Sequence, residues 1–274
     1  MNTDLLRGMD EMLAPHPHRR ARMSGMGIVW RADATDIAGI TDTGKVRARN
    51  EDSIGFDAGL GLLAVADGMG GHNAGDVASL LAIEHIFAAA EAAAEGPPTP
   101  HDDRRLQDAV RRANDAILGA ADLDADRAGM GTTVVAAWLS ETHVDVAHVG
   151  DSRLYRLRDG ALELLTRDHS QVQELVDRGI LTPAQARASN RRNYLSRALG
   201  TDPEVRIDCA RHALRGGDEF LLCSDGLTNM LEDEEIAAVL QAIRSAQAAA
   251  ERLVALANER GGRDNISVVI ARLG

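Results

Sequence analysis

Short apolar runs recur along the chain, and several of them come in pairs joined by only a few polar residues. Because these runs are bounded by Gly, Asp or Ser, they predict β-strands. The strands are expected at residues 35–40, 60–66, 134–139, 144–149, 154–157, 162–165, 205–209, 219–223 and 266–272. Residues 140–143 and the Asp159-Gly160 turn have the length of hairpin connections, which predicts antiparallel sheet.

Longer segments rich in Ala, Leu and Glu separate these runs and predict helices. The helices are expected at 74–95, from Asp102 or Asp103 to about residue 120, from 166–170 to 178, in a short segment from 182, at 233–243 and at 246–260. Asp168 or Ser170 is expected to cap the third helix, because either side chain can accept from a free N–H of the first turn. For His169, between them, a proton-donor role competes with the more usual capping or packing role.

The composition fits one large soluble domain, with 274 residues of which 45% are hydrophobic. A net charge of −12 argues against non-specific binding of nucleic acid or anionic lipid as the main activity. No apolar run reaches the length of a membrane span, and the first residues lack the hydrophobic core of a secretion signal. We therefore expect a cytoplasmic protein with no nucleic-acid or membrane partner.

Residues 1–33 are polar and without pattern, and we expect a disordered leader there, followed by one domain at residues 34–274. The two cysteines, Cys209 and Cys223, are far apart and stand in apolar or strand-like surroundings. They are expected to be core residues in a reducing compartment, since their spacing does not suit zinc. No sequence feature indicates an oligomer, so a monomer is expected.

The apolar run at residues 62–66 ends abruptly at Asp67-Gly68, and further glycines follow. A carboxylate at the exit of a buried strand suits a hard metal ion, and a glycine lets a backbone carbonyl approach the same ion. Such a pair is also common in simple turns. The glycine-rich run could cradle a phosphate, but it lacks the spacing of the known phosphate-binding loops.

Acidic residues also stand at the ends of other apolar runs. These are Glu51, Asp52, Asp151, Asp225 and Asp264. One such acid indicates a turn, whereas several in one chain predict strand ends that converge on a cleft. Carboxylates so close repel one another unless cations lie between them, and oxygen ligands without paired His or Cys favour magnesium or manganese over zinc. Arg47 lies either in a solvated charged turn or beside these acids, where it could bind an anion such as a phosphate ester.

In their order along the chain, these motifs resemble those of bacterial type 2C, metal-dependent (PPM) Ser/Thr protein phosphatases. The matching segments are Arg47-x-x-Asn50-Glu51-Asp52, Asp67-Gly68-Met69-Gly70-Gly71-His72, Gly131-Thr132-Thr133, Gly150-Asp151-Ser152-Arg153, Thr166-x-Asp168-His169-Ser170, Arg197-Ala198-Leu199-Gly200, Ser224-Asp225-Gly226-Leu227 and Asp264-Asn265. The resemblance implies an α+β fold: an antiparallel β-sandwich flanked by helices on both faces, with metals at one end.

The resemblance further implies two Mn²⁺ or Mg²⁺ ions as cofactors. Asp67 would bridge the two ions, and Asp225 with Asp264 would complete one of the sites. The Gly68 carbonyl would belong to the other site, where Glu51 would act through water.

Asp151, together with Asp225, would hold a third and weaker ion by the same resemblance. Arg47 would clamp the substrate phosphate, and Asp52 would orient metal-bound water. The hydroxide that bridges the metals would then attack phosphorus without a phosphoenzyme intermediate.

Two positions depart from the family pattern. Eukaryotic relatives have His directly after the Asp-Gly, as the proposed general acid, whereas this chain has Met69 there and its nearest His is His72. The proton donor is therefore either water bound to the metal or His72. In the segment that resembles the substrate flap, Ser189-Asn190 replaces the His-Pro of many bacterial relatives, which leaves substrate preference open. The basic residues of this segment are Arg187, Arg191 and Arg192, which form a solvated face or contact an anionic substrate.

The function that follows from the resemblance is dephosphorylation of phosphoserine or phosphothreonine in proteins, in opposition to a bacterial Ser/Thr kinase. Two alternatives remain: a pseudophosphatase that only binds a phosphoprotein, and a phosphatase that acts on a small molecule. Every metal carboxylate of the family pattern is present, which argues against the first alternative. The basic segment leans toward a peptide substrate over a small one.

Overall fold

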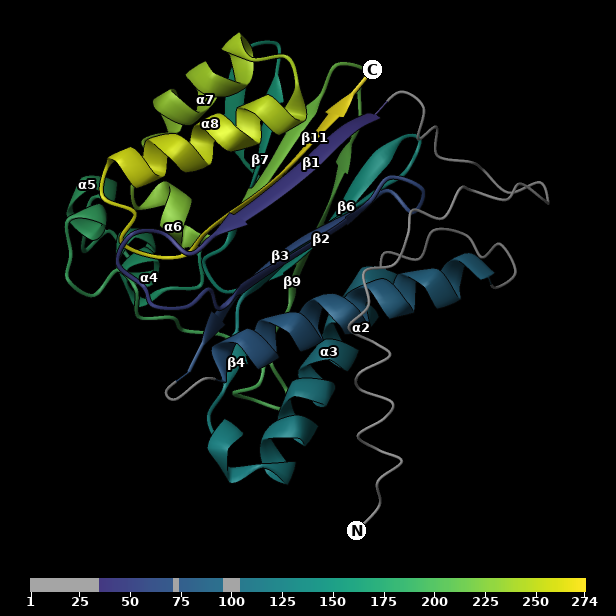
Figure 1. The fold of residues 1–274 in the computed structure, drawn as a ribbon, viewed down its shortest axis with the longest axis vertical. Coiled ribbons are helices and arrows are strands. Elements are labelled where there is room, and N and C mark those ends of the chain that lie inside the picture. Colours follow the sequence, from purple (N-terminus) through teal and green to yellow (C-terminus); the bar gives the residue numbers. More distant parts are fainter. Residues whose placement is uncertain (1–34, 71–73, 96–103) are drawn as a thin grey trace.

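Two antiparallel sheets pack face to face and carry helices on both outer faces, as Figure 1 shows. This arrangement comes from a computed structural model that describes residues 35–70, 74–95 and 104–274. The expected α+β sandwich is therefore confirmed. The leader expected at residues 1–33 and the helix start expected at Asp102 or Asp103 lie outside the described residues.

The first sheet has the strand order β1-β11-β10-β7-β8. Its strands are β1 (Thr35–Asp42), β7 (Arg153–Arg158), β8 (Ala161–Leu164), β10 (Glu219–Cys223) and β11 (Ile266–Leu273). The β7–β8 hairpin turns at Asp159 and Gly160, whose φ angles are 51° and 78°. These angles belong to the two-residue turn that Asp-Gly favours, so the predicted hairpin is confirmed.

The second sheet has the strand order β2-β3-β5-β6-β9, with β4 paired to β3. Its strands are β2 (Asp52–Asp57), β3 (Leu62–Met69), β4 (Gly131–Thr132), β5 (Val134–Leu139), β6 (His143–Val149) and β9 (Asp208–Ala213). Along β3, Leu63 and Val65 point into the core between the sheets, whereas Leu62 and Ala64 point toward the outer helices. Because both faces of β3 are buried from Leu62 to Ala66, this part of its sequence is continuously apolar.

Helices α2 (Gly75–Glu95) and α3 (Arg104–Leu123) cover the second sheet, and α7 (Asp233–Ala242) and α8 (Ala246–Glu259) cover the first (Figure 1). The short elements are η2 (Ala125–Arg127), α4 (Gln171–Asp177), α5 (Pro183–Arg187) and α6 (Asp225–Thr228). The hydroxyl of Ser170 accepts the Gln173 N–H at 3.3 Å, so Ser170, and not Asp168, caps α4.

The strand expected at residues 205–209 is wrong, because β9 begins only at Asp208. The Val205 N–H bonds to the Asp202 carbonyl in a turn, and the buried Ile207 side chain packs into the core beneath α2 and α3. β9 itself is a polar edge strand, which keeps its open side from pairing with other chains. Cys209 consequently is exposed, contrary to the expected core position, whereas Cys223 is buried as expected.

Candidate active site

Carboxylates from both sheets meet at one end of the sandwich. Asp67 lies near the end of β3, and Asp52, at the start of β2, is its partner in the strand register. In the other sheet, Asp225 follows β10 and Asp264 precedes β11. Antiparallel pairing puts the end of one strand beside the start of its neighbour, so acids far apart in sequence become neighbours in space.

A cavity of about 190 Å³ opens between these strand ends. It is lined by most of the residues that the sequence singled out: Arg47, Glu51, Asp67, Gly68, Asp151, Asp225 and Asp264. Met69 also lines the cavity, and a thioether cannot donate a proton there. His72, the alternative proton donor, lies outside the described residues.

Asp52 is a buried carboxylate with only 7% of its surface exposed. Its Oδ2 accepts from the hydroxyls of Ser224 at 2.8 Å and Ser267 at 2.7 Å, whereas its Oδ1 is buried without a partner. Burial raises the pKa of Asp52 to about 6, although the two hydroxyl donors lower it. An unpartnered buried oxygen beside the cavity is the kind of atom that accepts from an ordered water or faces a cation.

Ser224 and Ser267 were not predicted to have a role in the site. Both are fully buried, and both reach from the first sheet to a residue of the second. A signal was available for Ser267, because it is the polar residue within the otherwise apolar run 266–271, two positions after Asn265 and on the same face.

Gly68 is held between two backbone segments. A Cβ at this position would lie 2.2 Å from the Gly75 carbonyl oxygen and 2.3 Å from that of Glu51. The Gly68 N–H also donates to the Glu51 carbonyl at 3.1 Å. The site therefore accepts only glycine here, as expected where a backbone carbonyl approaches a ligand closely.

The carboxylates of the site carry a strong mutual repulsion. Burial raises the pKa of Asp67 well above its usual value, and the charges of Asp52 and Asp225 raise it further. Burial and the charge of Asp225 raise the pKa of Asp151 in the same way, and burial together with Asp264 raises that of Asp225 to about 7. Clustered oxygen donors with excess negative charge are what hard divalent cations bind. The donor set therefore fits magnesium or manganese.

The loop that carries Arg47 is fixed by one amide side chain. The Oδ1 of Asn265 accepts the Glu51 N–H at 2.9 Å, and its Nδ2 donates to the Arg49 carbonyl at 2.8 Å. Arg47, about half exposed, donates to Asp264 Oδ2 at 2.7 Å. A guanidinium thus stands at the mouth of the acidic cavity, where it can meet an anion.

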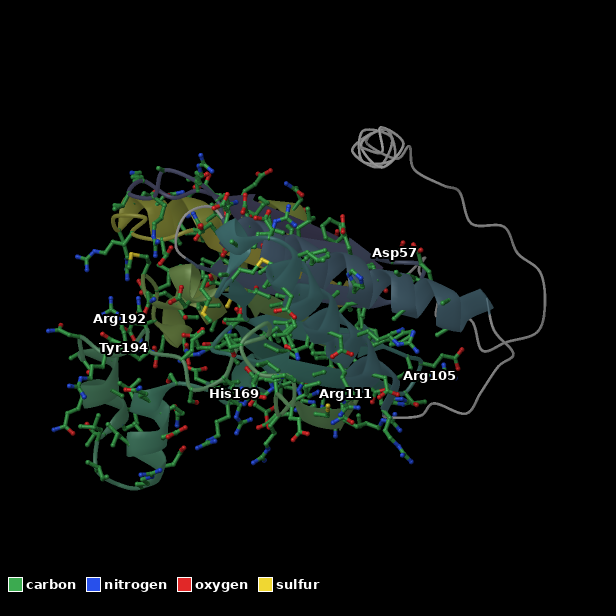
Figure 2. The ribbon with its side chains drawn as sticks, turned by 90° about the horizontal axis from the view of Figure 1, so that it is seen from below. Asp57, Arg105, Arg111, His169, Arg192 and Tyr194 are labelled. Carbon is green, nitrogen blue, oxygen red and sulfur yellow. The ribbon has the colours of Figure 1, made fainter. Side chains whose placement is uncertain are left out.

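A second cavity of about 200 Å³ adjoins the first and shares Asp151 and Asp225 with it. Arg187 and Arg192 line this second cavity, whereas Arg191 is an exposed residue outside the lining of both. Arg187 also forms an ion pair with Glu232. The labelled Arg192 lies close to Tyr194 at one end of the molecule in Figure 2. The structure therefore places two of the three predicted flap arginines beside the acidic site.

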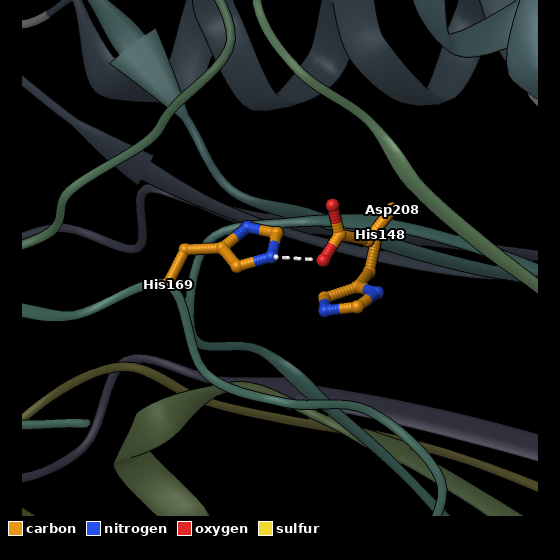
Figure 3. Close-up of side chains that lie close together, drawn as sticks. All are labelled: His148, His169 and Asp208. Carbon is orange, nitrogen blue, oxygen red and sulfur yellow. Dashed lines mark ion pairs between the residues drawn. The ribbon is translucent and has the colours of Figure 1, made fainter. Parts of the chain in front are cut away.

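His169 belongs to a network behind the site, drawn in Figure 3. Its Nδ1 accepts the Gly150 N–H at 3.1 Å, and its Nε2 lies 3.2 Å from Asp208 Oδ2. The ring stacks on His148 with 4.6 Å between centroids, and it is only 2% exposed. Of the roles considered for His169, the structure supports packing.

Comparison with known proteins identifies the chain. Residues 44–265 match the family profile described as Protein phosphatase 2C. The chain belongs to the protein phosphatase 2C family. The family predicted from the motifs is thereby confirmed.

Three relatives illustrate the match. The serine/threonine protein phosphatase PstP of Mycobacterium tuberculosis is 44% identical over 231 residues, which are 84% of this chain and 43% of PstP. This chain therefore spans less than half the length of that relative. The serine/threonine phosphatase stp of Listeria innocua is 38% identical over 84% of this chain and 92% of its own. A crystal structure of the PstP catalytic domain in complex with two manganese ions is 41% identical, with a TM-score of 0.77 over 87% of this chain and 98% of that chain.

Proposed function

We propose that this chain hydrolyses phosphoserine and phosphothreonine in proteins with the help of two Mn²⁺ or Mg²⁺ ions. The observation that carries the proposal is the convergence of carboxylates from both sheets on one cavity with Arg47 at its mouth. The names of the relatives, Ser/Thr protein phosphatases, support the reaction. The manganese complex of PstP supports the cofactor.

Asp67 would be shared by both ions, because it lines the cavity directly before Gly68 and its carboxylate is repelled by the charges of Asp52, Asp225, Asp151 and Asp264. Asp225 and Asp264, from the first sheet, would complete one ion's ligands. The Gly68 carbonyl, with Glu51 acting through water, would serve the other ion. Bound there, the ions would lower the pKa of water and neutralise charge on the phosphoryl group.

Asp151 would hold a third, weaker ion together with Asp225, since both line the boundary between the two cavities. Their repulsion in the protein favours a cation between them.

The remaining steps fall to residues beside the metal ligands. Arg47 would bind two phosphate oxygens, a task that suits the planar guanidinium. The unpartnered Oδ1 of Asp52 would accept a hydrogen bond from the attacking water and so orient it toward phosphorus. Water is our proposed proton donor to the leaving Ser or Thr oxygen, with His72 as the alternative.

We further propose that Arg187 and Arg192, with Arg191 beside them, contact the substrate chain near the phosphorylated residue. Their place at the adjoining cavity supports this for the first two. The substrates would be proteins phosphorylated by a Ser/Thr kinase, met by a cytoplasmic monomer. Among the described residues, no helix is both long and apolar enough to cross a membrane.

The test is release of phosphate from a phosphothreonine peptide in the presence of manganese, magnesium or chelator. Asp67→Asn and Asp225→Ala should lower turnover by at least about 10²-fold, since the ions supply several kcal/mol of transition-state stabilisation. Asp57→Asn is the matched control: it changes an exposed acid at the far end of β2 and should leave turnover unchanged.

Four outcomes would contradict the proposal. Release that resists chelator would exclude the metal-dependent reaction, and full turnover by Asp67→Asn would exclude the ligand assignment. No release from a folded, metal-loaded protein would favour a phosphoprotein-binding module. A strong preference for small phosphate esters over the peptide would favour a small-molecule phosphatase.

A further inference from the structure

We propose that His169 is a positioning residue that sets the direction of the Asp151 carboxylate by holding the backbone of Gly150. The proposal rests on the assignment of Asp151 as a metal ligand under the proposed function. It concerns a side chain for which neither the motifs nor the comparisons give a role.

His169 forms two hydrogen bonds with the backbone of Gly150. Its backbone N–H donates to the Gly150 carbonyl at 2.9 Å, and its ring Nδ1 accepts the Gly150 N–H at 3.1 Å. One residue thus satisfies both polar backbone groups of the position directly before Asp151. Because Asp151 directly follows Gly150, the position of its carboxylate depends on the backbone of this corner.

The turn at Gly150 and Asp151 cannot be fixed by packing of the Gly150 side chain, because glycine has none. Gly150 has a φ of 105°, which other residues rarely adopt, and a Cβ there would lie 2.5 Å from Thr133 Cγ2. On the other side of Asp151, the hydroxyl of Ser152 bonds that of Thr133 at 2.7 Å. The chain is therefore held on both sides of Asp151, by His169 at Gly150 and by Thr133 at Ser152.

The other side of the ring fixes its orientation. Nε2 of His169 lies 3.2 Å from Asp208 Oδ2, and the Arg197 guanidinium donates to the other oxygen of Asp208 at 2.7 Å. Figure 3 shows Asp208 reaching the ring edge while His148 covers its face. A neutral imidazole that accepts at Nδ1 must carry its proton at Nε2, and Asp208 is placed to accept that proton's hydrogen bond.

The same tautomer argues against a metal ion in this network. His148, His169 and Asp208 offer ligand atoms within 4.8 Å of one another, the spacing of a metal site. A metal at Nε2 of His169 would need the lone pair there and hence a proton on Nδ1, which would face the Gly150 N–H. The Arg197 guanidinium lies 3.1 Å from Nε2; because arginine only donates and Nε2 carries the proton, this contact is not a hydrogen bond, and its positive charge opposes a cation at this place. The network therefore orients a side chain and leaves no place for an ion.

Two amide variants test the roles of the two ring nitrogens of His169 separately. The Oδ1 of Asn reaches the place of Nδ1, so His169→Asn keeps an acceptor for the Gly150 N–H. Gln reaches the place of Nε2, so His169→Gln keeps contact with Asp208 and loses that acceptor. His212→Gln, at a half-buried histidine on β9, controls for the exchange of an imidazole for an amide.

The readout is calorimetric titration of the metal-free protein with Mn²⁺, which counts sites and measures each affinity without turnover. Asp151→Ala should remove the weakest site and keep the others. His169→Gln should weaken that site about tenfold, the effect of one lost hydrogen bond, whereas His169→Asn and His212→Gln should match wild type. Equal weakening by His169→Asn and His169→Gln would overturn the positioning role, as would a wild-type titration from folded His169→Gln.

If Asp151→Ala leaves the titration unchanged, the metal assignment fails and the positioning proposal falls with it. If Asp151→Ala removes the site and His169→Gln does not affect it, only the positioning proposal fails. The tautomer provides a test on wild-type protein that needs no variant to fold. Long-range ¹H–¹⁵N correlation should show the His169 proton on Nε2, and a proton on Nδ1 would overturn the proposal.

Discussion

Removing the hydroxyl of Ser267 tests whether Asp52 is held as an ionised carboxylate inside the protein. Ser267 is fully buried, and its hydroxyl donates to Asp52 Oδ2 at 2.7 Å. The substitution Ser267→Ala leaves Asp52 with the single donor Ser224, at 2.8 Å. It changes no metal ligand, so its effect on the metal-free fold can be measured in chelator.

The expected magnitude follows from the charge on the acceptor. A hydrogen bond to a charged group contributes about 1.5–3 kcal/mol. The same bond to the neutral acid contributes about 0.5–1.5 kcal/mol, so its loss disfavours the ionised form by roughly 1–1.5 kcal/mol more than the neutral form. At 1.36 kcal/mol for each pKa unit, this raises the pKa of Asp52 from about 6 by roughly one unit. Because the pKa of Asp52 in the fold is already above its ordinary value of 3.8, ionisation of Asp52 costs stability as pH rises. The variant should therefore lose stability with rising pH more than wild type does.

The assay is denaturant unfolding at pH 5 and pH 8, with chelator, for wild type, Ser267→Ala and Ser140→Ala. At pH 8 the Ser267 variant should lose about 1.5–3 kcal/mol, and at pH 5, where Asp52 is mostly protonated, only the roughly 0.5–1.5 kcal/mol of a neutral hydrogen bond. Ser140 is a buried hydroxyl in the β5–β6 turn, and its loss should cost the same at both pH values. An equal loss for Ser267→Ala at pH 5 and pH 8 would refute the reasoning.

Three further variants test Gly68 and Asp225 at the site and the ion pair between Arg158 and Asp218 in the first sheet. Gly68→Ala, whose Cβ would meet a backbone oxygen at 2.2 Å, should weaken Mn²⁺ binding at least about tenfold by calorimetry, whereas Gly119→Ala, with open space at its Cβ, should leave it unchanged. In chelator, Asp225→Asn should raise the thermal midpoint at pH 8 more than at pH 5, because the pKa of about 7 makes the ionised group costly only at high pH; equal shifts would contradict this. Asp218→Asn should cost about 1.5–3 kcal/mol of unfolding free energy, because it removes the buried carboxylate that accepts from two nitrogens of the partly exposed Arg158; a loss under about 0.5 kcal/mol would contradict it.

The sequence predicted the features that short-range chemistry decides. The first five residues of β3 and all of β5 are apolar because both faces of these segments are buried. The Asp159-Gly160 turn requires positive φ, which that residue pair adopts readily. The acidic residues at the strand ends could be recognised as well, since a charge next to a buried apolar run costs free energy unless another group compensates it. Their meeting in one cavity followed only once the strands were assumed to share a core.

The sequence did not predict what depends on long-range packing. β9 is an edge strand whose residues are mostly exposed, so its sequence has few apolar positions that would indicate a strand. The buried Ile207 lies just before β9, and its apolar side chain led to a strand being predicted too early in the chain. The hydrogen bonds from Ser224 and Ser267 to Asp52 join residues that are separated by 172 and 215 positions in the sequence. A single serine in a strand carries no local sign of its partner, because the partner comes from the other sheet.

The origin of the acids in two sheets ties the chemistry of the site to the stability of the fold. Asp52 and Asp67 belong to one sheet, and Asp225 and Asp264 flank strands of the other. Burial and the neighbouring acids raise the pKa values of Asp52, Asp67 and Asp225, so ionising these carboxylates together costs stability in the metal-free protein. A divalent ion held between them would offset that cost with a bridge from sheet to sheet. On the proposed function, the same ions that activate water would therefore also close the sandwich, and metal affinity and resistance to unfolding should rise together across variants of this end of the molecule.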